Sequence, residues 1–416
     1  NMCATILYHN KLQQMCLTKG FSMTELQELR RYRRDLHRIP ELDFDLPQTI
    51  AYIEGVLAPL DCELTHPCPS CVCAFFDAGL CAAHATAIRA DMDALPIAEA
   101  TGAAFASSHP GKMHACGHDM HMAMVLGAAI VLKSRERELQ GVVKVVFQPS
   151  EEKRPGGARL LLPELLKDPV PQAIFGQHVF PNLPTGTIGI RPGAFFASSD
   201  NIIFSVEGKG THAAMPHMGS DPILATACLI QFYQTLVTKF RDPLIPAVIS
   251  ITSVHGGTCN NVIPDKVEVL GTVRTHDNVL RYRIFELIEE KSKEICDLYG
   301  CTFTMDKTWN GLPVLVNDER LTKFVEHNAR ELLGEENVIP MNHLTLGEDF
   351  AIYLEKIPGA FWVLGVRPPE QESLPPLHNP KMSPDENAIR TGIALMVENC
   401  LRVFQQGEGY NKSRQS

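Results

Sequence analysis

Hydrophobic residues recur along the first half of the chain at spacings that alternate between those of strands and those of helices. Short apolar runs predict buried strands at residues 71–76, 85–90, 142–147 and 173–178. A helix is predicted over Met120–Lys133, and an earlier one from Ser22, where Ser22 and Glu25 have capping-box spacing, to Pro40. This alternation is typical of an α/β sheet covered by helices on both faces.

The chain between about residues 198 and 307 has a different order of elements. Strands are predicted at 201–207, 247–254, 266–275 and 301–305, and helices at 221–239 and 279–299. This β-α-β-β-α-β order is that of a ferredoxin-like module. A helix at 319–333, a strand at 360–365 and a helix at 385–405 follow. We therefore expect an α/β domain with a mixed sheet, formed by residues 21–193 and 308–406 and interrupted by an inserted α+β domain at 194–307.

Composition narrows the class of protein. The 416 residues are 45% hydrophobic and 21% charged, which is ordinary for a globular enzyme. A net charge of −10 argues against a nucleic-acid-binding protein. The longest mostly apolar run, Met122–Leu132, is shorter than the about 20 residues that a membrane span needs, and residues 1–20 lack a signal-peptide pattern. We expect neither a nucleic acid nor a membrane as partner.

Thirteen cysteines are scattered along the chain. Their odd number does not indicate a disulfide scaffold and favours a reducing, cytoplasmic compartment. Four cysteines lie close together in sequence and resemble a zinc knuckle: Cys62, Cys68, Cys71 and Cys73. Because Cys71 and Cys73 alternate along an apolar strand, we interpret them as small core residues.

The residues that indicate chemistry follow predicted strand ends, where open α/β sheets place their sites. In the segment 114–121, HACGHDMH, Cys116 and His118 are two residues apart and can reach one metal ion or two adjacent ions. A helix-capping loop with incidental histidines is the alternative. Glu151 and Glu152 follow the strand at 142–147, where one carboxylate can bind a metal while the other deprotonates water. A solvated acidic pair would have the same pattern.

Further candidates lie in later segments. His178 ends an apolar strand and His378 lies in a late loop, and either alone fits an ordinary core or loop histidine. One cysteine, three histidines and one glutamate together suit a pair of divalent ions, zinc first, with manganese or cobalt as alternatives. In the inserted module, His212 can donate a hydrogen bond to an oxyanion and Arg274 can hold a carboxylate, although each also fits a surface turn or strand end.

Taken in order, these motifs resemble the metal-dependent amidohydrolases that include hippurate hydrolase and the plant auxin-conjugate hydrolases, within the aminoacylase and carboxypeptidase G group. The resemblance covers about residues 22–405. It rests on LHRIPEL at 36–42, RADMDALP at 89–96, HACGHD at 114–119, GEDF at 347–350 and LHNP at 377–380. It implies hydrolysis of the amide bond of N-acyl amino acids. A di- or aminopeptidase on the same scaffold and a catalytically idle metal- or ligand-binding protein remain alternatives.

The same resemblance implies a role for each candidate residue. It makes Glu151 the general base and makes the inserted domain a lid and dimerisation domain, so that a homodimer or higher homo-oligomer is expected. His212, Asn261 and Arg274 would contact substrate, the histidine often across a dimer interface. The implied ligands of two metal ions are Cys116, His118, Glu152, His178 and His378.

Two departures from the family pattern bear on the site. Asp91 and Asp93 match a block in which more distant relatives carry a metal-binding His-x-Asp, but alanine precedes Asp91, so we expect both to support the ligands at most. The family usually has glycines directly after the paired glutamates, whereas here Lys153-Arg154-Pro155 come first. We expect this basic insertion to alter substrate preference.

Overall fold

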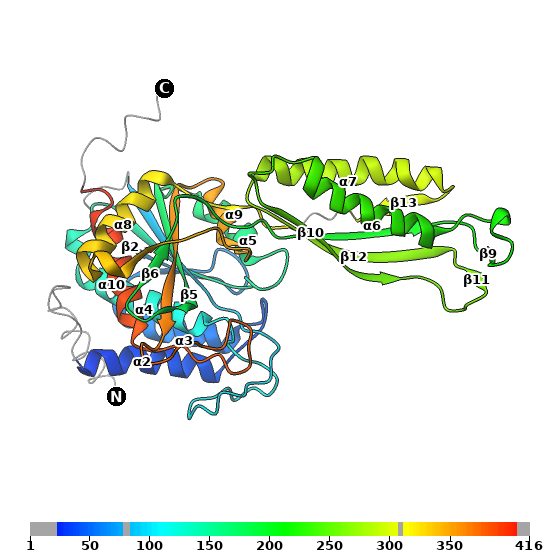
Figure 1. Cartoon of the computed structure of the whole chain (residues 1–416). Helices are drawn as coiled ribbons and strands as arrows, with labels where there is room; N and C mark the ends of the chain where they lie inside the picture. Colours follow the sequence, from blue (N-terminus) through cyan, green and yellow to red (C-terminus); the bar gives the residue numbers. More distant parts are fainter. Residues whose placement is uncertain (1–22, 78–83, 307–310, 406–416) are drawn as a thin grey trace, which may run out of the picture. The chain divides into compact units, whose positions relative to one another are not determined.

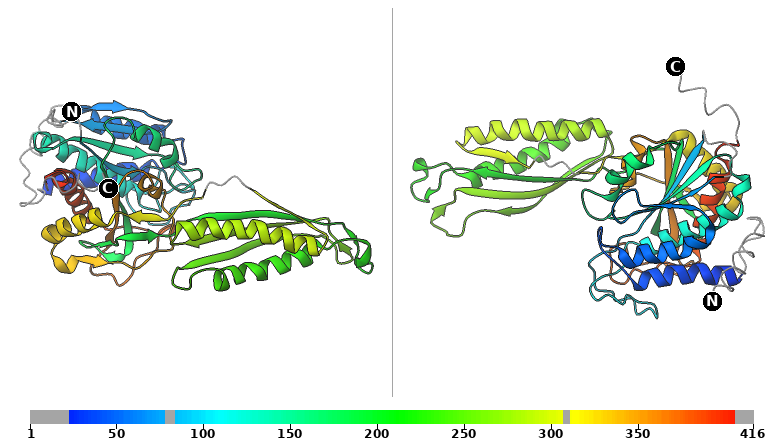
Figure 2. Two further views of the ribbon diagram at one scale, coloured as in Figure 1. Left: turned by 90° about the horizontal axis from the view of Figure 1, so that it is seen from above. Right: turned by 180° about the vertical axis from the view of Figure 1, so that it is seen from behind.

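The structure, a computed structural model of the chain, describes residues 23–77, 84–306 and 311–405. The chain divides into two compact units. One contains the chain up to Gly193, Asn317–Asn342 and the chain from Ile352 onward, and the other contains Ala194–Val316 and His343–Ala351. Each unit has a sheet packed against helices (Figures 1 and 2).

The first unit is built on an eight-stranded sheet in the order β1-β2-β4-β3-β5-β16-β6-β15. Its strands are β1 (Glu63–Thr65), β2 (Val72–Phe76), β3 (Ala85–Asp91), β4 (Val142–Gln148), β5 (Ala173–Pro184), β6 (Ile188–Ile190), β15 (Val338–Pro340) and β16 (Gly359–Arg367). The mixed sheet predicted from the sequence is confirmed, because β2 and β6 pair antiparallel with neighbours in an otherwise largely parallel sheet. Since β3, β4, β5 and β16 are mutually parallel, their carboxyl ends lie along one edge.

Helices cover this sheet. Those of the first unit and its boundary are α2 (Met23–Arg38), α3 (Pro47–Leu57), α4 (His118–Ser134), α5 (Gly157–Leu165), α8 (Glu319–Leu333), α9 (Phe350–Leu354) and α10 (Ala388–Arg402). The central helix is α4, which is buried along almost its whole length and contacts α2, α10 and β3. A helix that is apolar on all sides belongs in the interior, and α4 occupies that place.

Some boundaries differ from those predicted. The helix expected at Met120 begins at His118, because Gly117 caps it in a left-handed conformation. The helix expected at 385–405 begins only at Ala388, because Asp385 accepts a hydrogen bond from the backbone of Asn387 in a preceding turn. Ser22, the expected cap of the first helix, lies outside the described residues, as do residues 1–20.

The second unit contains a four-stranded antiparallel sheet in the order β10-β12-β8-β13. Its elements are β8 (Asp200–Glu207), α6 (Pro222–Lys239), β10 (Ala247–His255), β12 (Lys266–Thr275), α7 (Asn278–Leu298) and β13 (Thr302–Met305). The predicted β-α-β-β-α-β order is confirmed. Burial alternates along β8 and β12, because α6 and α7 cover one face of the sheet and leave the other exposed (Figure 1).

Shorter elements complete the two units. Two small sheets pair β9 (Thr211–His212) with β11 (Val262–Ile263) and β7 (Gly193–Phe196) with β14 (Leu315–Asn317). Short 3-10 helices lie at Ala58–Leu60, Glu136–Glu138, Pro216–Met218 and Glu335–Asn337. Among the described residues, no helix has the length and apolar character needed to cross a membrane.

Candidate metal centre

The first residues of the candidate metal centre lie in the tight turn that leads into α4. Gly117 has a φ of 84°, and a Cβ at this position would lie 2.5 Å from Cγ2 of Val179 on β5. Only glycine meets both demands, a left-handed backbone and a close approach to the neighbouring strand. The turn brings the buried side chains of Cys116 and His118 to the amino end of α4.

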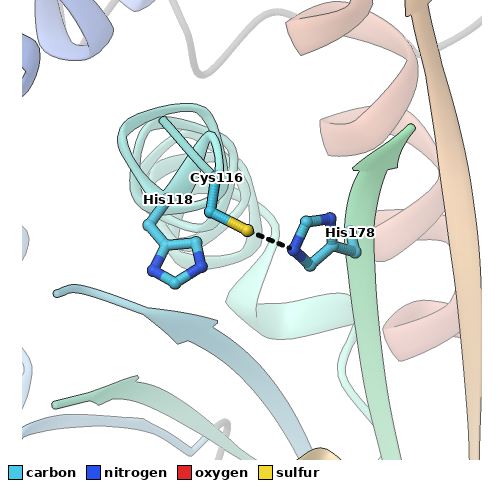
Figure 3. A group of neighbouring side chains, drawn as sticks. All are labelled: Cys116, His118 and His178. Carbon is cyan, nitrogen blue, oxygen red and sulfur yellow. Dashed lines mark hydrogen bonds between the residues drawn. The ribbon is translucent and has the colours of Figure 1, made fainter. Parts of the chain in front are cut away.

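The neighbouring strand β5 supplies His178. Figure 3 shows the Cys116 thiol pointing toward the imidazole of His178, and the Sγ–Nε2 distance is 3.4 Å. The other ring nitrogen of His178, Nδ1, lies 2.8 Å from the carbonyl oxygen of Val179. Since that carbonyl can only accept, Nδ1 carries the proton and Nε2 presents a lone pair toward Cys116.

His118 is oriented in the same way. Its Nδ1 lies 2.7 Å from the backbone carbonyl oxygen of Asp93, which fixes the proton on that nitrogen. Its Nε2 is buried and has no hydrogen-bond partner. Instead, Nε2 faces carboxylate oxygens of Asp91 at 3.6 Å and Glu152 at 3.9 Å. A buried imidazole lone pair without a partner costs free energy that a bound cation would repay.

The two glutamates lie on the loop that follows β4. Ser150 turns the chain with a φ of 52°, and the backbone amides of Glu151 and Glu152 donate hydrogen bonds of 2.8 and 3.1 Å to the two carboxylate oxygens of Asp93. Asp93 is buried and lies two residues after the end of β3. Its carboxylate therefore holds the two adjacent glutamates in place through their backbone.

His378 completes the set from the loop that precedes α10. It has a φ of 64°, its amide donates a hydrogen bond of 2.9 Å to the carbonyl oxygen of Ala115, and its Nε2 lies 3.1 Å from Oε1 of Glu152. About half of the side chain is exposed, with a relative accessibility of 51%. His378 thus lies at the solvent side of a set whose other histidines are buried.

Two groups of possible metal ligands share the Cys116 thiol. The ligand atoms of Cys116, His118 and His178 all lie within 4.8 Å of one another, and so do those of Cys116, Glu152 and His378. His118, Glu151 and Glu152 form a further such group. Thiolate, imidazole and carboxylate ligands are the donors that zinc and its neighbours prefer. With the unpartnered Nε2 of His118, this donor set fits a pair of divalent ions, which these side chains would hold.

Charges and burial set the protonation states around the centre. Burial lowers the pKa of His178 to about 3, which keeps the imidazole neutral as a ligand must be. Burial raises the pKa of Cys116, and the carboxylate of Glu152 adds to this effect. The thiolate that a metal site requires therefore needs the charge of a bound cation.

A support network lies behind the ligands; the sequence analysis expected Asp91 to belong to it but gave no role to His121. His121 contacts Oδ1 of Asp91 through Nδ1 at 2.6 Å and accepts a hydrogen bond of 2.9 Å from the amide of Val179 through Nε2. Although burial opposes ionisation, the imidazoles of His118 and His121 and the guanidinium of Arg89 hold the pKa of Asp91 well below its usual range. His121, the third histidine of the HACGHDMH motif, could have been recognised from the sequence as a neighbour of the ligands, since it lies one helical turn from His118.

The other candidates lie in the second unit. His212 on β9 is exposed, and its Nδ1 accepts a hydrogen bond of 3.1 Å from the amide of Ala214. Asn261 is also exposed, and its carbonyl oxygen accepts from the amide of Ala213 at 3.0 Å, so the structure brings His212 and Asn261 together at the β9–β11 sheet. Arg274 lies in a different sheet, on β12, where its guanidinium donates to the carbonyl oxygen of Val273 at 3.0 Å.

Comparisons with known proteins agree with this geometry. Residues 87–402 match peptidase family M20/M25/M40. The chain is 37% identical to an N-acetyl-L-cysteine deacetylase of Bacillus subtilis, over 90% of this chain and 88% of that protein. It is 35% identical to an IAA-amino acid hydrolase of Arabidopsis thaliana, over 89% of this chain and 84% of that protein.

Solved structures also indicate this peptidase family. A Bacillus subtilis protein described as a dinuclear metal-binding peptidase of the M20 family superposes with a TM-score of 0.78 at 35% identity, over 91% of this chain and 98% of that chain. The family match spans most of the sequence and includes every proposed ligand and both glutamates. The chain belongs to peptidase family M20/M25/M40, a family of enzymes that hydrolyse amide bonds.

Proposed function

We propose that this chain is a metal-dependent amidohydrolase that cleaves N-acyl amino acids into a carboxylic acid and a free amino acid. The observation that carries the proposal is the pair of ligand groups that share Cys116, with a Glu151 oxygen within 4.8 Å of the ligand atoms of His118 and Glu152. The deacetylase and the IAA-amino acid hydrolase described above support the choice of substrate class.

The two ions would be held by the side chains that surround the Cys116 thiol. When bound, such a pair supplies Lewis acidity and lowers the pKa of water. We assign zinc to the site, with manganese or cobalt as alternatives, because sulfur and imidazole donors suit these borderline ions. The five side chains assigned as ligands are Cys116, His118, Glu152, His178 and His378.

Glu151 is the general base in this proposal. Its carboxylate takes a proton from the attacking water and then delivers that proton to the leaving amine. The two roles require a carboxylate that stays in one position through the reaction, and the hydrogen bond from its amide to Asp93 restrains the backbone at that point. His212 donates a hydrogen bond to the oxyanion that develops on the substrate carbonyl.

The second unit serves as a lid and dimerisation domain. Asn261 and Arg274 bind the substrate, and the guanidinium of Arg274 meets its carboxylate. We further propose a homodimer or higher homo-oligomer in which His212 reaches the centre of the partner subunit. The protein is assigned to the cytoplasm, because the cysteines in the described part of the chain are all unbridged.

The decisive experiment compares Glu151→Gln with a matched control, Glu164→Gln. Glu164 lies on α5 of the same unit and pairs with Lys167 at the surface. We expect Glu151→Gln to lose nearly all turnover of N-acetyl, N-benzoyl and indole-acetyl amino acids while it retains its metal, and Glu164→Gln to behave as the parent. Unchanged turnover in Glu151→Gln would overturn the assignment of the base.

The same assay separates the alternatives. Preferential turnover of free dipeptides would indicate a di- or aminopeptidase, and bound metal without turnover on the whole panel would indicate an idle metal-binding protein. Mixing His212→Ala with Glu151→Gln tests action across an interface, because a mixed dimer contains one intact site. We expect roughly a quarter of parental activity after subunit exchange. A strictly monomeric protein in light scattering would contradict the dimer.

A further inference from the structure

A cluster of three cysteines lies outside the metal centre, two in the loop between β1 and β2 and the third on β2 itself. Cys68, Cys71 and Cys73 fall within six residues of sequence. Cys71 and Cys73 are buried, as expected for small core residues, and their sulfur atoms are 3.8 Å apart. Cys68 differs from them, because it is only partly buried.

A β-turn holds Cys68 and Cys71 close together. The amide of Cys71 donates a hydrogen bond of 3.3 Å to the carbonyl oxygen of Cys68, with Pro69 and Ser70 between them. Ser70 has a φ of 61°, as the third position of a type II turn requires. Such a turn brings its first and fourth Cα atoms within about 7 Å, and disulfides join Cα atoms about 4.4–6.8 Å apart. The turn thus presents the pair at a distance that a disulfide can span.

Contacts with neighbouring segments keep this turn in place. The hydroxyl of Ser70 donates a hydrogen bond to the carbonyl oxygen of Phe44, and Nδ1 of His66 lies 2.9 Å from the carbonyl oxygen of Cys71. Beyond the turn, Val72 pairs with Phe147 of β4. These contacts restrain the backbone of the turn and of the residue that follows it, so the two cysteines need little backbone movement to come together.

The environment distinguishes the two thiols chemically. A hydrogen bond with Cys71 lowers the pKa of Cys68, and the same contact, together with Cys73 and burial, raises the pKa of Cys71. The accessible thiol is therefore the one that ionises first, and the thiolate is the reactive form of cysteine. The buried thiol stays protonated beside it.

We propose that Cys68 and Cys71 form a redox-active dithiol that a hydroperoxide converts to a disulfide. The Cys68 thiolate attacks a peroxide oxygen, the O–O bond breaks, and the sulfur becomes a sulfenic acid as hydrogen peroxide is reduced to water. The Cys71 sulfur then attacks the Cys68 sulfur, and the S–O bond breaks. The hydroxyl leaves as a second water with the proton of the Cys71 thiol. Two thiols are oxidised by two electrons in total, and a dithiol reductant reverses the change.

The test uses the full-length, metal-loaded protein. After treatment with a small excess of hydrogen peroxide, the protein is unfolded in guanidinium chloride so that buried thiols also react. Free thiols are then alkylated with N-ethylmaleimide, and the chain is digested and analysed by mass spectrometry. We expect alkylation of Cys68 and Cys71 to fall more than about tenfold, with a loss of about 2 Da between them. Alkylation of Cys62, the internal control, should not change. Dithiothreitol should restore both thiols.

Three variants decide between the possible outcomes. Cys71→Ala should leave Cys68 as a sulfenic acid that dimedone traps, and Cys68→Ser should protect the buried Cys71 from oxidation. Cys73→Ala should still form the disulfide. The proposal is wrong if peroxide leaves alkylation of Cys68 unchanged, if Cys68 passes to a sulfinic acid with no disulfide while Cys71 is present, or if Cys71 pairs with Cys73. Because Cys68→Ser alters a half-exposed side chain, the test does not depend on tolerance of core substitutions.

Discussion

The carboxylate of Asp93 accepts a hydrogen bond of 2.8 Å from the backbone amide of Glu151 and a second, of 3.1 Å, from that of Glu152. The backbone carbonyl of the same residue fixes the proton on Nδ1 of His118. One residue at the end of β3 therefore orients the proposed base, one proposed carboxylate ligand and one proposed imidazole ligand. Hydrogen bonds to an ionised acceptor are the stronger kind, so this arrangement resists displacement.

Asp93→Asn should reduce activity without unfolding the protein. The amide replaces one acceptor oxygen by a donor that must face an N–H group, so the loop that carries Glu151 loses its position. Loss of such a supporting contact typically costs about 10–100-fold in metal affinity or activity. Steady-state kinetics and metal titration provide the measurement, and the loss should fall on kcat or on metal affinity rather than on KM. Asp43→Asn, which removes only the exposed pair with Lys153, is the control.

Gly117→Ala should destabilise the metal centre more than the same change at Gly102. Both glycines have a positive φ, of 84° and 71°, but a Cβ at Gly102 meets nothing within 4 Å. The left-handed conformation costs alanine about 1–2 kcal/mol at either position. At Gly117 the contact with Val179 adds about 1–3 kcal/mol of overpacking. Thermal unfolding and metal content check the difference, and equal effects at both glycines would refute the steric argument.

Arg281→Met should weaken the second unit while leaving the metal centre intact. The guanidinium of Arg281 makes two hydrogen bonds, of 2.7 and 2.6 Å, to the carboxylate of Asp200, and both side chains are buried. Removing one partner of a buried pair leaves an uncompensated charge, which lowers the free energy of unfolding by about 3–5 kcal/mol. Arg283→Met on the same helix removes an exposed pair with Glu286 and should cost at most about 1 kcal/mol. Urea unfolding and metal content report the two effects separately.

The buried carboxylate of Glu99 should make stability depend on pH under acidic conditions. Burial opposes its ionisation, but hydrogen bonds with His37, Ser107 and Thr101 outweigh this and lower its pKa to about 2. Because the pKa in the folded state lies below that of the unfolded chain, about 4.3, the carboxylate stabilises the fold above that pH. This contribution is lost as the pH falls from about 4.5 toward 2.

Urea unfolding of the parent and of Glu99→Gln at a series of pH values tests this expectation. The free energy of unfolding of the variant should lie below that of the parent above about pH 5, and the two should converge as the pH falls. Glu335→Gln, at an exposed position, reports the general effect of removing one negative charge. A difference that grows with acidification would contradict the assigned direction.

The main elements of both units could be predicted because their patterns are strong. Strands buried on both faces are continuous apolar runs, and β8 and β12 alternate in burial because only one face of their sheet is covered. Strands β1, β6 and β15 were missed, because three residues are too few to show a period. Helix α3 was missed as well, although Pro47 at its first position was a usable signal.

The set of candidate ligands could be proposed from the sequence for a different reason than the strands and helices. Thiol, imidazole and carboxylate side chains after strand ends are rare enough to stand out, and parallel strands bring such ends to one edge. The hydrogen bonds that orient these side chains could not be predicted from the sequence. Asp93 acts on backbone amides of Glu151 and Glu152, and such contacts depend on the path of the loop and not on the identity of the residues whose amides donate.

The order of strands in the eight-stranded sheet has a consequence for how the protein is made. Strand β16 lies between β5 and β6, yet it is synthesised long after both of them. A nascent chain on the ribosome therefore carries β5, the strand of His178, with one hydrogen-bonding edge unfilled until the last part of the chain emerges. An unpaired strand edge invites pairing with other chains. We expect chaperones to be needed during this interval, and we expect metal to enter only after release from the ribosome.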